Sequence, residues 1–87
     1  MELFIKICGI TNLEDAELAV SCGADALGFI MYEKSPRKIN KEKVLNIIEK
    51  LPERIDPVLV FVNSSSEYVE TCLEMSPKLI PQFHGEE

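Results

Sequence analysis

The chain has 87 residues, a formal net charge of -6 at pH 7 and 46% hydrophobic residues. This length allows at most one small domain, and the hydrophobic fraction is ordinary for a globular protein. The acidic balance, without any block of basic residues, argues against binding to nucleic acid or to an anionic membrane. No run approaches the roughly 20 apolar residues that a membrane span needs.

The cysteines and the first residues indicate a reducing compartment. Cys8, Cys22 and Cys72 share no metal-ligand spacing, and His84 is the one histidine, so we expect no metal site. The N-terminus lacks the basic segment and the long apolar core of a signal peptide, since Lys6 interrupts the first apolar run. We therefore expect reduced thiols and a cytoplasmic location.

The first apolar run, residues 3–7, predicts a buried strand that ends in Cys8 and a glycine. Alternation along this strand places Phe4, Lys6 and Cys8 on one face and Leu3, Ile5 and Ile7 on the other. The aliphatic second face should pack on helices. The first face becomes polar at its carboxyl end, where α/β folds place their chemistry.

A helix is predicted next, because Thr11-x-x-Glu14 fits a capping box and Gly23 fits a left-handed helix end. Its apolar stripe at helical spacing consists of Leu13, Ala16, Ala19 and Val20. Residues 25–30 form a second short apolar run and predict a second strand. Within it, Gly28 indicates the close approach of a neighbouring backbone or ligand.

Residues 31–40 are long for a connection from a strand to a helix, and long loops more often carry function. Asn40 can cap the helix that follows, and Pro52 ends it. The apolar repeat of this helix consists of Val44, Ile47, Ile48 and Leu51. Residues 57–62 are a continuous apolar run, which is typical of a strand buried in a parallel sheet.

The last part of the chain repeats the pattern. Ser64-x-x-Glu67 offers another capping box, and the run at 79–83 predicts a fourth strand. The helix between them has one apolar face, formed by Val69, Cys72 and Leu73. Strands alternating with helices predict an α/β fold with a parallel sheet. Pro81 has no amide to donate, which favours an edge strand or a bulge.

Cys8 is the leading candidate for chemistry. Backbone amides and a helix N-terminus beside a thiol at the carboxyl end of a strand can lower the pKa of such a thiol. As a thiolate it could act as a general base or as a nucleophile; the alternative is a small buried hydrophobic residue. Cys72 lies on the apolar face of its helix, and we interpret it and Cys22 as packing residues.

Arg37 belongs to the long loop, and its guanidinium could bind a carboxylate or a phosphate in a bidentate manner. The alternative is a solvated basic loop, because Lys34 and Lys38 are near it. Strand alternation places Gln82 and His84 on one face, where they could line the same mouth as Cys8. The alternative for His84 is a local role beside the following helix cap.

The sequence resembles the phosphoribosylanthranilate isomerases in five blocks that occur in the same order. These are KICGIT at 6–11, GADALGF at 23–29, SPR at 35–37, VFVN at 60–63 and QFHG at 82–85. The resemblance implies the N-terminal half of a (β/α)8 barrel, a TIM barrel, of tryptophan biosynthesis. It also implies a reaction without cofactor, the Amadori rearrangement of N-(5-phosphoribosyl)anthranilate to 1-(2-carboxyphenylamino)-1-deoxyribulose 5-phosphate.

By this resemblance Cys8 is the general base, Arg37 holds the anthranilate carboxylate, and Gln82 and His84 are further substrate-binding residues. Two features of the family have no counterpart in these residues: its general acid, an aspartate on a later strand, and its phosphate site after the seventh and eighth strands. Phe83 stands where the family usually has a smaller aliphatic residue.

We therefore expect residues 1–87 to form a partial barrel of about three and a half βα units, an N-terminal fragment that is inactive alone. Its open sheet edges would self-associate or pair with a complementary half-barrel. The alternative is a non-catalytic half-barrel, either a remnant or an assembly module.

Overall fold

A computed structural model describes residues 3–32, 34–36 and 38–84, with the backbone alone at His84. It contains β1 (Lys6–Cys8), α1 (Leu13–Ser21), β2 (Ala26–Ile30), α2 (Lys41–Glu49), β3 (Asp56–Val62), α3 (Ser66–Leu73) and β4 (Ile80–His84). The alternation of strands and helices predicted from the sequence is confirmed. No helix within these ranges is long and apolar enough to cross a membrane.

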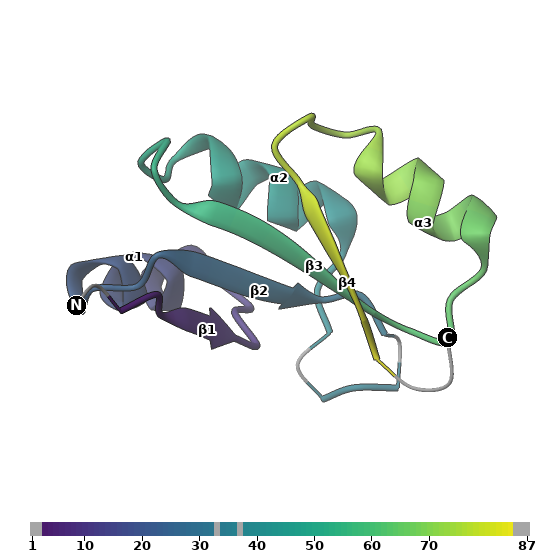
Figure 1. Cartoon of the computed structure of the whole chain (residues 1–87), viewed down its shortest axis with the longest axis horizontal. Helices are drawn as coiled ribbons and strands as arrows, with labels where there is room; N and C mark the ends of the chain where they lie inside the picture. Colours follow the sequence, from purple (N-terminus) through teal and green to yellow (C-terminus); the bar gives the residue numbers. More distant parts are fainter. Residues whose placement is uncertain (1–2, 33, 37, 85–87) are drawn as a thin grey trace.

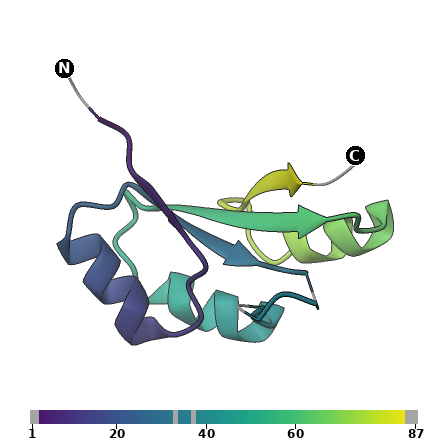
Figure 2. The same ribbon diagram turned by 90° about the horizontal axis from the view of Figure 1, so that it is seen from below.

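The four strands form one parallel sheet whose spatial order, β1-β2-β3-β4, is also the order of the chain. All four strands point the same way, so their carboxyl ends meet at one edge of the sheet (Figure 1). In Figure 2 the three helices lie on one side of the sheet, and no helix of the described chain covers the other side. This is the arrangement of half a (β/α)8 barrel, with the helix-free face corresponding to the barrel interior.

The side chains divide between the two faces as strand alternation requires. On the helix side, Leu27, Phe29, Leu59 and Phe61 are fully buried against the helices and form the centre of the main core. On the helix-free face there is only a small cluster of Ala26, Val58 and Val60, with Ile30 packed against it. Pro81 lies in β4, at the edge of this sheet, as predicted.

The first strand is shorter than predicted and is shifted toward its carboxyl end. β1 begins only at Lys6, and Leu3 and Ile5 remain 75% and 41% exposed instead of packing on helices. Of the three aliphatic residues on this face, Leu3, Ile5 and Ile7, only Ile7 packs against the main core. The Ile5 carbonyl still accepts hydrogen bonds from the amides of Asp25 and Ala26, so the early residues are tied to β2 by the backbone. They are exposed because β1 is the edge of the described sheet and has a neighbour on one side only.

Two of the three helix N-caps lie one residue after the predicted position. The N-cap of α1 is Asn12, whose side chain accepts a hydrogen bond from the Asp15 amide at 2.7 Å, and not Thr11. The N-cap of α3 is Ser65 and not Ser64. Thr11 and Asn12 are both good capping residues, as are Ser64 and Ser65, so the sequence alone does not decide which residue of each pair is the N-cap. Asn40 caps α2 as predicted, accepting from the Lys43 amide.

Candidate functional site

Cys8 is the last residue of β1, and its side chain is exposed. The chain turns immediately after it at Gly9, which has φ 86°. The amides of Gly9 and Ile10 both donate to the carbonyl oxygen of Gly28, at 3.0 and 3.1 Å. The end of β1 is therefore fixed to β2, and the thiol is held at the carboxyl edge of the sheet.

The Cys8 side chain lies directly over Gly28. These two residues are register partners in β1 and β2, and a Cβ atom placed on Gly28 would be 2.8 Å from the Cys8 Sγ. The close approach predicted at Gly28 is confirmed, but the nearest group is the side chain of Cys8, with the Cys8 backbone behind it, and not a backbone or a ligand alone.

A hydrogen bond spans the helix-free face from the first strand to the fourth. The Lys6 Nζ donates to the Gln82 Oε1, and the two residues are 76 positions apart in the chain. Gln82 therefore lies on the face that carries Cys8, as predicted. Lys6 was not among the candidate site residues, although strand alternation had placed it on this face. A lysine inside an otherwise apolar strand was the sequence feature that could have indicated it.

A cavity of about 540 Å³ adjoins Cys8. Gly9, Thr11 and Cys22 line it on the side of β1 and α1, and Pro36 lines it from the long loop. The described part of the long loop therefore reaches the neighbourhood of the thiol at Pro36. Arg37 itself lies outside the described residues.

The two other cysteines differ in burial. Cys72 is fully buried on α3, as predicted, and burial raises the pKa of its thiol, although a hydrogen bond with Tyr68 and the charge of Lys41 oppose this effect. Cys22 is the C-cap of α1 and is exposed, so its interpretation as a packing residue is wrong. The apolar stripe of α1 ends at Val20, and the helix turns the two residues after it toward solvent.

His84 is the last residue of β4, and its backbone is paired with Val62 in register. It lies two positions after Gln82, so the backbone places both residues on the same face of the strand. The side chain of His84 is outside the described part of the chain, and its role stays a prediction.

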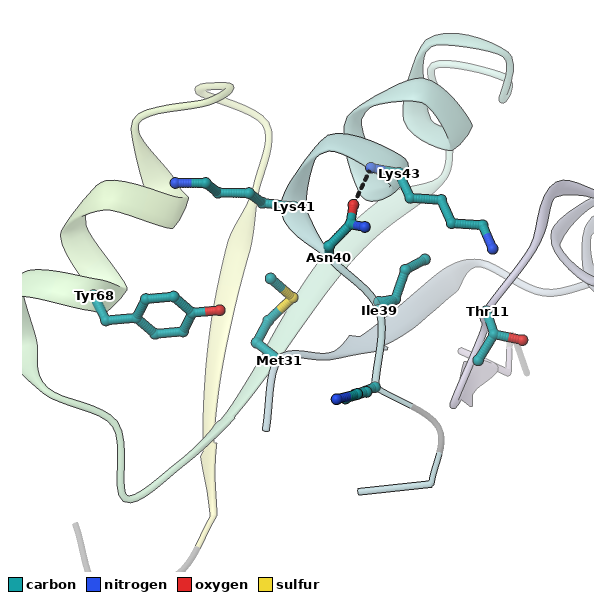
Figure 3. A pocket seen from close by; sticks show the side chains of 8 residues that line it. Thr11, Met31, Ile39, Asn40, Lys41, Lys43 and Tyr68 are labelled. Atoms are coloured by element: carbon teal, nitrogen blue, oxygen red, sulfur yellow. Dashed lines mark hydrogen bonds between the residues drawn. The ribbon is translucent and has the colours of Figure 1, made fainter. Parts of the chain in front are cut away.

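A second cavity, of about 510 Å³, lies where the long loop enters α2. It contains three lysines, but in Figure 3 the side chains of Lys41 and Lys43 point to opposite sides of Asn40. Met31 and Tyr68 close it on the side of α3. These charges do not converge on one point, so the cavity is a weaker candidate than the one at Cys8. Among the described residues, no group of three or more His, Cys, Asp or Glu residues could hold a metal ion.

The fold and the site define a class of protein: part of a (β/α)8 barrel, with polar and thiol groups on the strands that would face the barrel interior. Residues 5–87 match the family described as N-(5'phosphoribosyl)anthranilate (PRA) isomerase. The chain belongs to this family.

Known isomerases resemble this chain both in sequence and in structure. The N-(5'-phosphoribosyl)anthranilate isomerase of Dechloromonas aromatica is 41% identical over 87 residues, which are all of this chain and 42% of that protein. The crystal structure of the phosphoribosyl anthranilate isomerase from Thermotoga maritima is 44% identical, with a TM-score of 0.93 over 99% of this chain and 42% of that one.

A further crystal structure shows such an isomerase in complex with reduced 1-(o-carboxyphenylamino)-1-deoxyribulose 5-phosphate. It is 44% identical, with a TM-score of 0.92, over 99% of this chain and 44% of that one. The chain thus spans less than half the length of the relatives that it matches.

Proposed function

We propose that residues 1–87 form one partial barrel that supplies the base of a phosphoribosylanthranilate isomerase. The observation that carries the proposal is the position of Cys8, an exposed thiol at the carboxyl end of β1, in a cavity that the long loop also lines. Membership of the isomerase family supports the choice of reaction. Free thiols persist in reducing compartments, which agrees with the cytoplasmic location that we propose.

The reaction is an internal redox isomerisation. A general acid protonates the ring oxygen of N-(5-phosphoribosyl)anthranilate, and the C1–O bond breaks to give an open-chain iminium. The Cys8 thiolate then takes the proton from C2, which is acidic because it lies next to the iminium carbon. The electron pair of the C2–H bond moves to form an enolamine, and tautomerisation leaves a ketone at C2 and an amine at C1. C2 is oxidised and C1 is reduced, so no external oxidant is needed.

The other predicted site residues would bind the substrate. Arg37 would hold the anthranilate carboxylate with its planar guanidinium, and its neighbour Pro36 already lines the Cys8 cavity. Gln82 and His84 end the last described strand on the interior face. The crystallised complex of a relative contains a phosphorylated carboxyphenylamino sugar, which supports a substrate of this class.

The rest of a barrel must supply the general acid and the phosphate site. Neither has a counterpart in the residues of this chain, which covers 42% of the Thermotoga maritima relative. The partner that we propose is therefore a complementary set of βα units that pairs with β1 and β4. Without these complementary βα units, the chain would instead self-associate through the same two edge strands. The exposed side chains of Ile80 and Phe83 on β4 favour this self-association.

The test uses this chain joined to the remaining βα units of the Thermotoga maritima isomerase, a protein that we call the completed barrel. Substrate consumption is followed by fluorescence. We expect Cys8→Ser to lower kcat by about 10²-fold or more, because a positioned base contributes about 10²–10⁴-fold. Cys72→Ala, which removes a thiol on α3 that does not line this cavity, is the control and should keep normal turnover in the folded protein. Full activity of the Cys8 variant would overturn the proposal.

A further inference from the structure

We propose that Gly28 is a positioning residue: its lack of a side chain provides the space in which the Cys8 thiol is held. This inference rests on the proposed role of Cys8 as the base. It assigns a function to a glycine of β2 that touches the reacting group without itself reacting.

The geometry leaves no room for a side chain at this position. A Cβ atom on Gly28 would lie 2.8 Å from the Sγ, 3.2 Å from the Cα and 3.4 Å from the Cβ of Cys8. Carbon and sulfur do not approach to 2.8 Å without a bond, so the Sγ would have to rotate away. The contact with the Cys8 Cα at 3.2 Å is tight as well, so the backbone of Cys8 would have to shift by a few tenths of an ångström.

The conformation of the backbone does not explain the glycine. Gly9 and Gly23 have positive φ angles, whereas Gly28 is not among the positive-φ residues and lies inside a regular strand. Glycine weakens the interior of a strand, because it loses more conformational freedom than other residues and has no side chain to pack. Its neighbours on the same face of β2, Ala26 and Ile30, both carry side chains. The space for Cys8 is the feature that favours glycine here.

The backbone of Gly28 contributes a second restraint on the same group. Its carbonyl oxygen accepts from the amides of Gly9 and Ile10, and this fixes the turn that follows Cys8. Gly28→Ala keeps this carbonyl as the acceptor for the turn and fills the space under the thiol with a methyl group. The substitution therefore isolates the positioning effect from the turn.

The first experiment compares thiol reactivity in the completed barrel, in which β1 is no longer a free edge. Cys8 and Cys22 are both exposed, so Cys22 serves as an internal reference for alkylation by iodoacetamide, read by peptide mapping. We expect Gly28→Ala to change the ratio of the Cys8 rate to the Cys22 rate at least threefold. The matched control is Ala26→Ser, which adds one atom on the same face of β2 two positions earlier, and it should leave the ratio unchanged. An unchanged ratio in Gly28→Ala would overturn the proposal.

The second experiment measures kinetics in the completed barrel. We expect Gly28→Ala to lower kcat by about 10–100-fold with KM changed less than about twofold, because a small misplacement of a catalytic group can cost about 10²-fold. In a Cys8→Ala background, which has no Sγ to displace, Gly28→Ala should cause no further loss. A further loss there would indicate a general structural effect and overturn the proposal.

The two proposals fail in different ways. If Cys8→Ser keeps full turnover, the role of Cys8 as the base is wrong, whatever the alkylation ratio shows. If Cys8→Ser is inactive but Gly28→Ala has normal kcat and a normal alkylation ratio, Cys8 remains the base and only the role of Gly28 is wrong.

Discussion

Pro36 brings the loop of residues 31–40 to the cavity that Cys8 lines. Its neighbour Arg37 is the residue that we expect to recognise the carboxylate. Arg37→Lys keeps the charge but loses the planar pair of donors, so we expect KM in the completed barrel to rise by about 10-fold. Steady-state kinetics would measure this change. Lys34→Met, in the same loop, is the control for a general effect of basic charge, and equal KM values for Arg37→Lys and the unchanged protein would argue for a solvated loop.

Single residues differ in how far they could be predicted. The position of Cys8 at the end of a strand was predictable, because it depends only on where one apolar run ends. The hydrogen bond between Lys6 and Gln82 was not, because it depends on the order and curvature of four strands and on two long side chains meeting across them. Cys22 was misinterpreted because the exposure of a helix's last turn depends on what packs beside it.

At the scale of the elements, the N-cap of α1 allows a direct test. Asn12 accepts from the Asp15 amide, and its Nδ2 also donates to the Asp15 carboxylate at 3.1 Å. Asn12→Ala should lower the free energy of unfolding by about 1 kcal/mol, because an amide in the first turn loses its acceptor. Urea unfolding of the completed barrel would measure it. Thr11→Ala is the paired control, and its free energy of unfolding should stay within about 0.5 kcal/mol of that of the unchanged protein. A larger loss for Thr11→Ala than for Asn12→Ala would show that Thr11 is the cap.

The element order was predictable because each run has a clear period, of two residues in strands and 3.6 in helices. The ends of the elements were less so. Thr11 and Asn12 can both cap, as can Ser64 and Ser65, and the choice depends on where the preceding strand releases the chain. The sequence predicts too early a start for β1, because residues 3–5 have the apolar pattern of a buried strand although the structure leaves them exposed.

For the whole molecule, the helix-free face and the two outer strands decide the behaviour of the 87-residue polypeptide. Phe4 is 68% and Ile80 is 42% exposed, and β1 and β4 each lack a neighbour on one side in the described sheet. Exposed apolar surface costs roughly 25 cal/mol per Å², against a total stability of about 5–15 kcal/mol for a domain. We expect the polypeptide alone to self-associate and to show no turnover, and sedimentation with the fluorescence assay would measure both.

Ile80→Lys should reduce this association, because a charge on an edge strand opposes strand pairing. Asn46→Lys introduces the same charge on the exposed surface of α2 and should leave the association unchanged. A compact monomer would contradict the structural part of the expectation. Turnover that disappears in Cys8→Ser would contradict the catalytic part.

The strand order β1-β2-β3-β4 is also the order in which a ribosome makes the chain. Each new strand finds its partner in the strand made just before it, so every pairing closes a short loop and none has to wait for a distant segment. Vectorial synthesis can therefore lay down this sheet one βα unit at a time, with the helices covering one side as they emerge. The bond between Lys6 and Gln82 is different, because it joins residues 76 positions apart and can form only after the fourth strand has docked.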